Sequence, residues 1–463
     1  MTPTPFSVRG KRVVVVGAAR SGVAAAELLV RRGATVTLTD LRESIEEEAR
    51  LRSAGVALEL GEHRPSTLVE ADLIVLSPGV PPRLQVLDRA RAAGVPITGE
   101  LELASRWLRG RIVAITGTKG KSTTTTLTGR MLEAGGHRVL VGGNIGLALS
   151  AQVDESTEQT IHVVEASSFQ LESTTAFRPW IAVLLNFSPD HLDRHENVEE
   201  YGAAKARIFA RQEPTDWAVL NADDPASLTL ARAGRAKRLL FSMSTDDRPV
   251  GEGIVIAGEA IVKRTAQGEE PLVPLSSVKL LGRHLLADVL AAAAVASIAG
   301  VDAAAMTKAV EGFTGLEHAL EPAAEVGGVR FVNDSKATNI EAARRAIESF
   351  GDGLIVILGG KFKGGDFGDL RAPLRERHAQ VVAMGEAKPL IRAALAAAVP
   401  VHDAADMAAA VRTAFAIASP GGVVVLAPAC ASFDLFRDYA ERGRVFKQEV
   451  QRLQESWNSM REQ

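Results

Sequence analysis

The chain has 463 residues, 46% of them hydrophobic, which is enough for about three domains with substantial cores. Its formal net charge of −3, without any block of Lys and Arg, argues against a nucleic-acid-binding protein. A single cysteine, Cys430, excludes an intramolecular disulfide, suits a reducing compartment and reads as core filling.

The start of the chain shows no sign of export or membrane anchoring. Residues 1–12 lack the apolar core of a signal peptide. The longest apolar stretch, 289–300, is rich in Ala and too short to span a bilayer. We therefore expect a cytoplasmic protein without membrane insertion.

Short runs of Val, Ile and Leu followed by helical segments recur along the chain, a pattern that predicts an α/β fold with buried parallel sheets. The runs fall into three blocks, and we expect domains at 1–108, 109–314 and 315–463. Strands are predicted at 12–16, 35–39, 72–76, 111–116, 161–164, 181–186, 217–220, 330–332, 354–358, 380–384 and 422–426. The region 246–274 reads as irregular, and a polar helix ends the chain.

In the first block, GAARSG at Gly17–Gly22 follows a strand, and Asp40 ends the next strand where a dinucleotide fold places its ribose-binding acid. Ala19 replaces the middle glycine of GxGxxG, which hinders close approach of a pyrophosphate. A nucleotide-sugar, NAD and a plain turn all remain open from these residues. Ser77 follows the third strand, and ligands of open sheets gather at such strand ends, so its position weakly supports a ligand site at this sheet edge.

The second block opens with the most informative motif, GTKGKST at Gly117–Thr123, which joins an apolar strand to a predicted helix. Glycines let backbone N–H groups close on an anion, and the helix N-terminus adds its dipole. Lys121 can reach terminal phosphates and Ser122 can hold Mg²⁺. A full P-loop has a glycine at Ile115, so this is a shortened form. The alternative is a glycine turn carrying a solubilising lysine.

Further polar groups follow the strands beside this loop. Glu165 ends one buried strand, and Asp190 and His191 follow another. Carboxylates and imidazole at one sheet edge suit a hard cation and substrate phosphates, although each alone could be a helix cap or a turn. Lys205, in YGAAKARIF, reads by its spacing as an ordinary solvated helical lysine.

The third block places three polar loops after strands, at 333–339 (NDSKATN), 359–366 (GGKFKGGD) and 427–432 (APACAS). Lysines, hydroxyls and exposed N–H groups are suited to binding a small substrate that bears a carboxylate and to stabilising charge on a phosphoryl group. Any one of these loops could also be an ordinary turn.

Taken together, the motifs of this chain resemble those of the Mur ligases, in the same order and over nearly the whole chain. They are GTKGKSTT, VGGNIG, EASSFQLE, NFSPDHLDRH, YGAAKARIF, NDSKATN, KGGDF and APACASFD. NDSKATN with the CASFD segment points to the branch that adds D-glutamate. The resemblance implies a UDP-binding Rossmann-like N-terminal domain, a central P-loop ATPase domain with a parallel sheet, and a Rossmann-like C-terminal domain. It also implies ATP, two Mg²⁺ ions, UDP-N-acetylmuramoyl-L-alanine and D-glutamate, and we expect a monomer.

The same resemblance implies roles residue by residue. Catalytic roles fall to Lys121, Glu165, His191, Lys205, Asp334 and Lys336. ATP contacts fall to Gly117, Thr118, Lys119, Gly120, Lys121, Ser122, Thr123, Asp288 and Asp334. UDP-sugar contacts fall to Ser21, Arg42, Ser77, Asn144 and Gln170, and glutamate contacts to Lys336, Thr338, Lys363, Ser432 and Tyr439. Metal ligands would be Ser122, Glu165, His191 and Lys205, the last if it is carbamylated.

Four positions depart from the family pattern: Lys119, Leu285 and Asp288 stand where asparagines are usual, and Ala319 where an arginine is usual. Asp288 lacks the donors of an amide, and Ala319 supplies no cation, a loss that Lys119 could offset. These changes keep open a catalytically silent UDP-sugar-binding protein. A ligase for L-glutamate or another amino acid is the closer alternative; a folylpolyglutamate synthetase and an NAD-dependent dehydrogenase fit less well.

Overall fold

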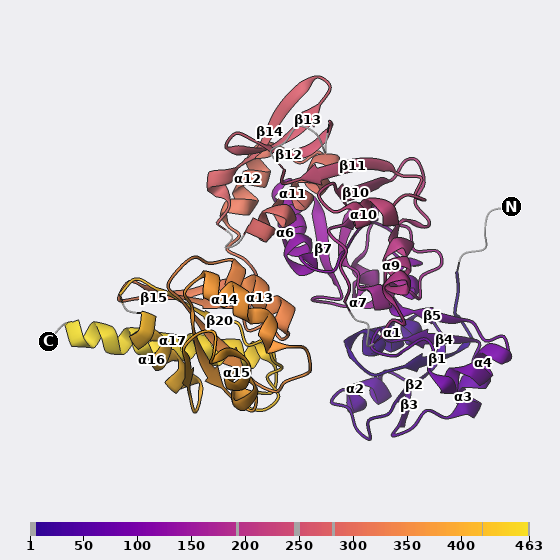
Figure 1. The fold of residues 1–463 in the computed structure, drawn as a ribbon. Helices are drawn as coiled ribbons and strands as arrows, with labels where there is room; N and C mark the ends of the chain where they lie inside the picture. The colour runs from indigo at the N-terminus through magenta and orange to yellow at the C-terminus, as the bar shows by residue number, and fades with distance from the viewer. Residues whose placement is uncertain (1–5, 191–193, 245–250, 280–282, 419, 462–463) are drawn as a thin grey trace. The chain divides into compact units, whose positions relative to one another are not determined.

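A computed structural model describes residues 6–190, 194–244, 251–279, 283–418 and 420–461 (Figure 1). The chain divides into two compact units. The first unit comprises Met1–Val278 and Ala287–Gly312, and the second comprises Lys279–Leu286 and Phe313–Gln463. Within the described residues the first unit contains two sheets and the second contains one, and parallel pairing dominates in all three. The α/β fold class is therefore confirmed, whereas the exact domain borders stay a prediction.

The N-terminal sheet is wholly parallel, with the order β3-β2-β1-β4-β5 among the described strands. Its elements are β1 (Arg12–Val16), α1 (Arg20–Arg31), β2 (Thr35–Asp40), α2 (Glu48–Ser53), β3 (Ala57–Leu60), α3 (Pro65–Val69), β4 (Leu73–Leu76), η1 (Gln85–Leu87), α4 (Asp88–Ala92), β5 (Ile97–Gly99) and α5 (Glu100–Ser105). Gly22 lets α1 approach β1 closely, because a Cβ there would lie 1.8 Å from the Gly17 carbonyl oxygen.

The central sheet has the order β14-β13-β12-β11-β10-β9-β6-β8-β7 among the described strands. Its elements are β6 (Arg111–Thr116), α6 (Lys121–Ala134), β7 (Arg138–Gly143), α7 (Leu149–Gln152), η2 (Val153–Glu155), β8 (Thr160–Glu165), α8 (Ser168–Leu171), β9 (Ile181–Leu184), α9 (Val198–Ala206), η3 (Arg207–Phe209), β10 (Trp217–Asn221), α10 (Pro225–Leu230), β11 (Lys237–Ser242), β12 (Gly253–Ala257), β13 (Ala260–Thr265), β14 (Gly268–Pro274), η4 (Leu275–Ser277), α11 (Arg283–Ile298) and α12 (Ala303–Glu311). This order sets β6 between β8 and β9, so the segments after these three strands are neighbours at one edge.

The prediction of an irregular region at 246–274 was wrong for its described part. Residues 253–274 form β12, β13 and β14, which pair antiparallel at the edge of the central sheet. Gly258 and Gly268, both at positive φ, stand at the ends of two of these strands. The polar run GEEP in β14 hid the strand, because its exposed residues give no continuous apolar signal.

The sheet of the second unit has the order β15-β16-β20-β17-β18-β19 among the described strands, with only β15 antiparallel to its neighbour. Its elements are β15 (Glu321–Val326), β16 (Val329–Asn333), α13 (Ile340–Glu348), β17 (Leu354–Gly359), η5 (Phe367–Leu370), α14 (Arg371–Glu376), β18 (Gln380–Met384), α15 (Lys388–Leu395), β19 (Val401–Asp403), α16 (Met407–Ala418), β20 (Val423–Leu426) and α17 (Tyr439–Arg461). The three predicted polar loops follow β16, β17 and β20, which are adjacent, so they share one edge.

Both faces of this sheet are covered, which explains its continuous apolar strands. Val356 and Leu358 of β17 pack into one hydrophobic cluster, whereas Ile355 and Ile357 pack into another on the opposite face.

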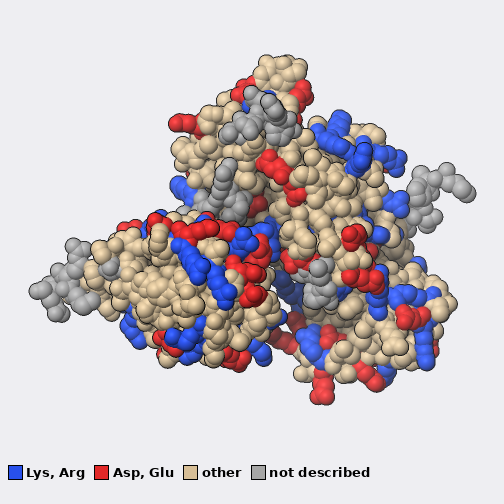
Figure 2. All heavy atoms as spheres, viewed as in Figure 1, with Lys and Arg blue, Asp and Glu red and all other residues tan. Residues whose placement is uncertain are grey.

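On the face of the molecule seen in Figure 2, Lys and Arg side chains are interspersed with Asp and Glu. Among the described helices, none is both long and apolar enough to cross a membrane.

Candidate functional site

The phosphate loop lies between β6 and α6, as predicted. Gly117 and Gly120 have φ of +157° and +81°, conformations that favour glycine. Gly120 is the N-cap of α6 and supplies no side-chain cap, so the positive end of the helix dipole lies at this loop. The Lys121 ammonium donates to the carbonyl oxygens of Gly117 at 3.0 Å and Thr118 at 2.9 Å. A cation and a helix N-terminus thus meet in one short loop.

The segment after β9 braces the phosphate loop. The Lys119 N–H donates to Asn186 Oδ1 at 2.9 Å, and Asn186 Nδ2 donates back to the Lys119 carbonyl at 3.2 Å. The Thr118 hydroxyl donates to the Ser188 carbonyl at 3.1 Å. The Lys119 ammonium lies 3.2 Å from Asp190 Oδ2, so its charge is engaged by a carboxylate. That ion pair weakens the idea that Lys119 replaces the cation missing at Ala319.

Lys205 is buried beneath the loop, so the expectation of a solvated helical lysine was wrong. Its side chain is 1% exposed, and its ammonium donates to the Gly117 carbonyl at 2.7 Å. The ammonium also lies 4.7 Å from the centre of the Tyr201 ring. Burial, reinforced by the charge of Lys121, lowers the pKa of Lys205 well below 10.5. Burial therefore favours the neutral amine here more than water does.

Glu165 ends β8 beside the phosphate loop and is 2% exposed. Its Oε1 accepts from Asn144 Nδ2 at 2.7 Å, while Oε2 is buried without a hydrogen-bond partner in the described part of the chain. Ser167, rather than Glu165, caps α8. The carboxylate thus offers one free oxygen at the edge where Lys121 lies.

An oxygen of this kind fits a hard cation, but the described protein groups alone do not build a metal site. Across the described ranges, no three His, Cys, Asp or Glu side chains gather closely enough to hold a metal ion. His191, predicted as a ligand, lies outside the described residues. A Mg²⁺ ion here would depend on phosphate oxygens and water besides Glu165 and Ser122, which is its usual manner of binding.

Asp288, on α11, packs directly against the phosphate loop. A Cβ on Gly120 would lie 2.1 Å from Asp288 Oδ1. Asp288 is 4% exposed, and its Oδ2 has no hydrogen-bond partner among the described residues. Burial raises the pKa of Asp288 well above 3.8, against the opposing effects of the nearby Thr124 hydroxyl and the charge of Lys121. When protonated, Asp288 would have an O–H donor, as the amide usual in the family has N–H donors.

Residues predicted for the UDP-sugar meet at a cleft in the first unit. Ser21, Ser77 and Asn144 line a cavity of about 140 Å³ between the loops after β1, β4 and β7. Gln170 lines a smaller neighbouring cavity that also includes Ser77, and the buried Ser77 Oγ and Gln170 Nε2 have no partner among the described residues. Arg42 does not line either cavity.

Arg42 is instead paired with Asp40, its Nε lying 2.9 Å from Oδ1. Burial alone would raise the pKa of Asp40, but hydrogen bonds from the Arg42 side chain and the Ala18 N–H lower it to about 2. The carboxylate thereby braces the Gly17–Gly22 loop and presents Arg42 at the end of β2. The structure therefore gives Asp40 a local structural role.

In the second unit, Asp334 and Lys336 follow β16. Asp334 Oδ1 accepts from the Leu320 N–H at 3.1 Å, and burial raises the pKa of Asp334 to about 7, although Lys336 opposes the shift. Lys336 is exposed, and its N–H donates to the His318 carbonyl at 3.0 Å. Their relation to the phosphate loop, which belongs to the first unit, stays a prediction.

The residues predicted for glutamate occupy the adjoining loops. Lys363 is exposed, Thr338 is half-buried, and Tyr439 is 40% exposed at the start of α17. Ser432 is 2% exposed in the loop after β20. Two backbone hydrogen bonds between Lys361 and Ala431, of 2.9 and 3.0 Å, join this loop to the one after β17. The unit thus brings polar groups from three segments to one edge.

Sequence reasoning passed over two buried groups at this edge. His318, at φ +65°, lies with Nδ1 2.9 Å from Asn333 Nδ2, and its ring meets that of Tyr439 edge to face. Arg442 is 1% exposed and donates to several carbonyls. The polar GLEHALE turn was a signal for His318, whereas nothing in the local spacing marks Arg442 as buried.

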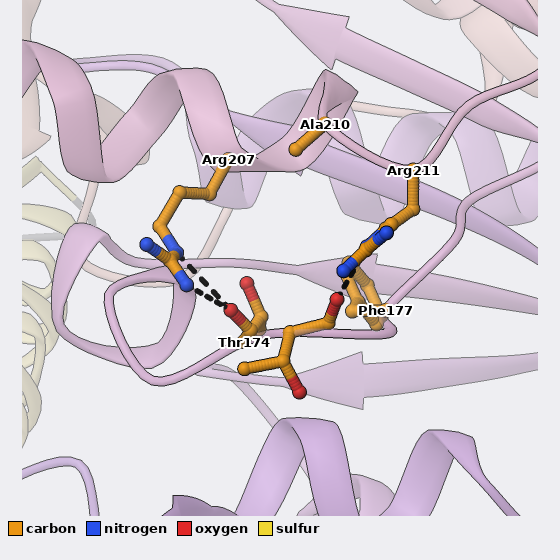
Figure 3. A pocket seen from close by; sticks show the side chains of 6 residues that line it. Thr174, Phe177, Arg207, Ala210 and Arg211 are labelled. Atoms are coloured by element: carbon orange, nitrogen blue, oxygen red, sulfur yellow. Dashed lines mark hydrogen bonds between the residues drawn. The ribbon is translucent and has the colours of Figure 1, made fainter.

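A larger cavity, of about 230 Å³, has no predicted site residue in its lining (Figure 3). Arg207 and Arg211 reach from one helical segment toward the loop at 174–177 and donate to the carbonyls of Thr174 and Thr175. Since both guanidinium groups serve the loop backbone and the lining is mainly apolar, this cavity is distinct from the polar sheet edges.

Three family models match the chain in order. They are a Mur ligase MurD-like N-terminal domain at residues 11–99, a Mur ligase middle domain at 115–296 and a Mur ligase glutamate ligase domain at 320–430. Among curated proteins, the UDP-N-acetylmuramoylalanine–D-glutamate ligase of Acidobacterium capsulatum is 48% identical, with 96% of each chain covered. The ligase of the same name from Desulfosudis oleivorans is 43% identical, with 97% of this chain and 98% of the relative covered.

Solved structures share the fold. A pseudomurein peptide ligase type C from Methanothermus fervidus, 18% identical, aligns with a TM-score of 0.59 over 96% of this chain and 100% of its own. The UDP-N-acetylmuramate–alanine ligase MurC of Thermotoga maritima, 20% identical, has the same TM-score and coverage. With three family models matched in order and relatives aligned nearly end to end, the chain belongs to the Mur ligase family.

Proposed function

We propose that this chain is an ATP-dependent acid–amino-acid ligase that joins D-glutamate to UDP-N-acetylmuramoyl-L-alanine in peptidoglycan precursor synthesis. The observation that carries the proposal is the phosphate loop with Lys121 and the buried Glu165 at one sheet edge, in a chain whose relatives bear this ligase name over nearly their full length. The lining of the cavity beside Asn144 supports a second ligand next to that edge.

The chemistry requires activation, because a carboxylate is a poor electrophile. ATP would transfer its terminal phosphoryl group to the L-alanine carboxylate, and the D-glutamate amine would attack the resulting acyl phosphate, releasing phosphate and leaving an amide. Lys121 and the positive end of the α6 dipole would stabilise charge on the transferring phosphoryl group.

Mg²⁺ would neutralise phosphate charge when bound, and Ser122 and Glu165 would hold it, with His191 at a second ion. Glu165 suits this role because its Oε2 is buried without a described partner. Lys205 would contribute as a carbamate, since its lowered pKa favours the neutral amine that reacts with carbon dioxide. The remaining ATP contacts would come from Gly117, Thr118, Lys119, Gly120, Thr123, Asp288 and Asp334.

The substrates would occupy two further places. The UDP-sugar would be bound at the cleft of the first unit by Ser21, Ser77, Asn144 and Gln170. Arg42, which lines neither cavity, would contact the UDP-sugar beyond them. D-Glutamate would be bound in the second unit by Lys336, Thr338, Lys363, Ser432 and Tyr439. The two lysines suit a substrate with two carboxylates. We further propose that the protein is cytoplasmic, where its proposed substrates are made, and that it acts as a monomer.

The test is phosphate release from ATP and Mg²⁺ with UDP-N-acetylmuramoyl-L-alanine, comparing D-glutamate, L-glutamate and no amino acid, with the product mass checked. Release and an amide product that require D-glutamate are expected. Activity with L-glutamate alone would move the assignment to a stereochemical variant. Silence despite UDP-sugar binding would favour a catalytically inactive protein.

A further inference from the structure

Arg442, near the start of α17, is a buried cation that the chemistry proposed above does not use. Its side chain is 1% exposed and is among the largest fully buried side chains of the described protein. Burial lowers the pKa of Arg442 only to about 10, so the guanidinium stays charged at neutral pH. A buried charge is retained only where fixed partners satisfy it.

The partners of Arg442 come from the ends of three neighbouring strands. Nε donates to Ser335 Oγ and Nη2 donates to the Ser335 carbonyl, both at 2.9 Å, in the loop after β16. Nη1 donates to the Cys430 carbonyl at 3.1 Å, in the loop after β20, and to the Gly359 carbonyl at 3.5 Å, at the end of β17. One guanidinium therefore links all three polar loops of the second unit.

Space around the guanidinium is tight, which limits alternative arrangements. A Cβ on Gly360 would lie 3.1 Å from Arg442 Nη1 and 2.2 Å from the Ala431 carbonyl oxygen. The Ser335 hydroxyl, which accepts from Arg442, also donates to the Tyr439 carbonyl at 2.7 Å and so joins the first turn of α17 to the loop after β16. The three loops and the helix start therefore form one connected network.

We propose that Arg442 is a positioning residue whose planar guanidinium sets the spacing of these three loops for capture of the incoming amino acid. The proposal rests on the proposed function, because the loops carry Lys336, Lys363 and Ser432. A lysine in its place would keep the charge but not the fork, since its single ammonium cannot reproduce donors fixed in one plane. Geometry, rather than charge alone, is what Arg442 supplies.

The kinetic test compares Arg442→Lys with Arg444→Lys, an exposed arginine two residues farther along the same helix. For Arg442→Lys we expect the KM for D-glutamate to rise about tenfold or more, with the KM for the UDP-sugar changed by less than about twofold. Arg444→Lys should leave both constants unchanged. A loss shared equally by all substrates, or none at all, would overturn the proposal.

A second measurement does not depend on activity. Amide hydrogen exchange of the full chain should quicken about tenfold or more at Lys361, Ala429 and Ala431 in Arg442→Lys, because these N–H groups donate between the three loops. Val381, whose N–H bonds at the start of β18, should keep its protection. Unchanged exchange at the loop amides would overturn the proposal even if kinetics were altered.

Ser335→Ala supplies an independent variant in case Arg442→Lys folds poorly. It removes the hydroxyl that accepts from Nε but leaves the buried guanidinium in place. We expect a smaller rise in the glutamate KM, and a double-mutant cycle with Arg442→Lys should be non-additive. Additive effects would contradict a shared network. If wild type shows no D-glutamate-dependent turnover, the proposed function fails, while hydrogen exchange still decides the positioning role.

Discussion

Replacing Asp334 by Asn tests whether this buried carboxyl group holds a proton near neutral pH. Asp334 is 9% exposed, and its Oδ1 accepts from the Leu320 N–H. Burial raises its pKa to about 7, although the charge of Lys336 opposes the shift. Asn keeps an acceptor oxygen and a similar shape but cannot titrate. The substitution therefore removes the proton equilibrium with little change in packing.

The magnitude follows from linkage between protonation and folding. A folded pKa of about 7, against 3.8 for the ordinary group, corresponds to about 4 kcal/mol. The unfolded carboxyl ionises near 3.8 while the folded one keeps its proton, so the native state binds more protons across this window. Wild-type stability should fall as pH rises from about 4 to about 7 and then level off. The stability of Asp334→Asn relative to wild type should rise by about 4 kcal/mol over the same window.

Trp457 allows the unfolding of the second unit to be followed by itself. It is the tryptophan of that unit, and its ring packs edge to face on Phe415 at 5.4 Å. In protein labelled with 5-fluorotryptophan, its ¹⁹F resonance can be assigned with Trp457→Phe. Urea titrations at roughly one-unit steps between about pH 4 and about pH 8 then give the free energy of unfolding for wild type and variant.

A matched control and a clear negative outcome complete the experiment. Asp369→Asn alters an exposed carboxylate of the same unit and should leave the pH dependence unchanged. If the difference between Asp334→Asn and wild type stays constant within about 1 kcal/mol from pH 4 to pH 7, Asp334 ionises normally and the argument from burial is refuted.

Three further predictions concern the proposed substrates. Lys121→Ala should lower kcat by about 10³-fold or more, because it removes the cation next to the phosphate loop, and normal phosphate release would exclude that role. Lys363→Ala should raise the KM for D-glutamate about tenfold or more and change that for the UDP-sugar by less than about twofold; an unchanged glutamate KM in steady-state kinetics would refute it. Burial raises the pKa of Asp288, so wild-type ATP affinity should weaken as pH rises through that pKa and a carboxylate comes to face the phosphates. Calorimetric titration of Asp288→Asn with ATP should show no such weakening. If wild type and Asp288→Asn have identical pH profiles of ATP affinity, Asp288 does not control ATP binding.

Strands buried on both faces could be predicted closely, because such burial leaves an unbroken apolar run. LIVILG of β17 and VVVL of β20 are of this kind, and the polar residues that follow such strands meet at one edge by parallel pairing alone. Strand β11, interior but with exposed residues, was missed. Edge strands were missed: β3 reads ALEL and β19 reads VHD, since each is short and partly exposed. Their identity depends on a neighbour supplied by the rest of the fold.

The sequence by itself determined the α/β class, the order of the three sheets along the chain, and the phosphate loop, since these follow from local glycines, apolar runs and chain order. Only the tertiary structure decided which polar groups lose contact with water. Lys205 and Asp288 are ordinary surface residue types, yet one lies under Gly117 and the other against Gly120. Arg442 binds the carbonyl of Ser335, 107 residues away. Burial depends on all the elements packed around a side chain, so no local pattern could specify these environments.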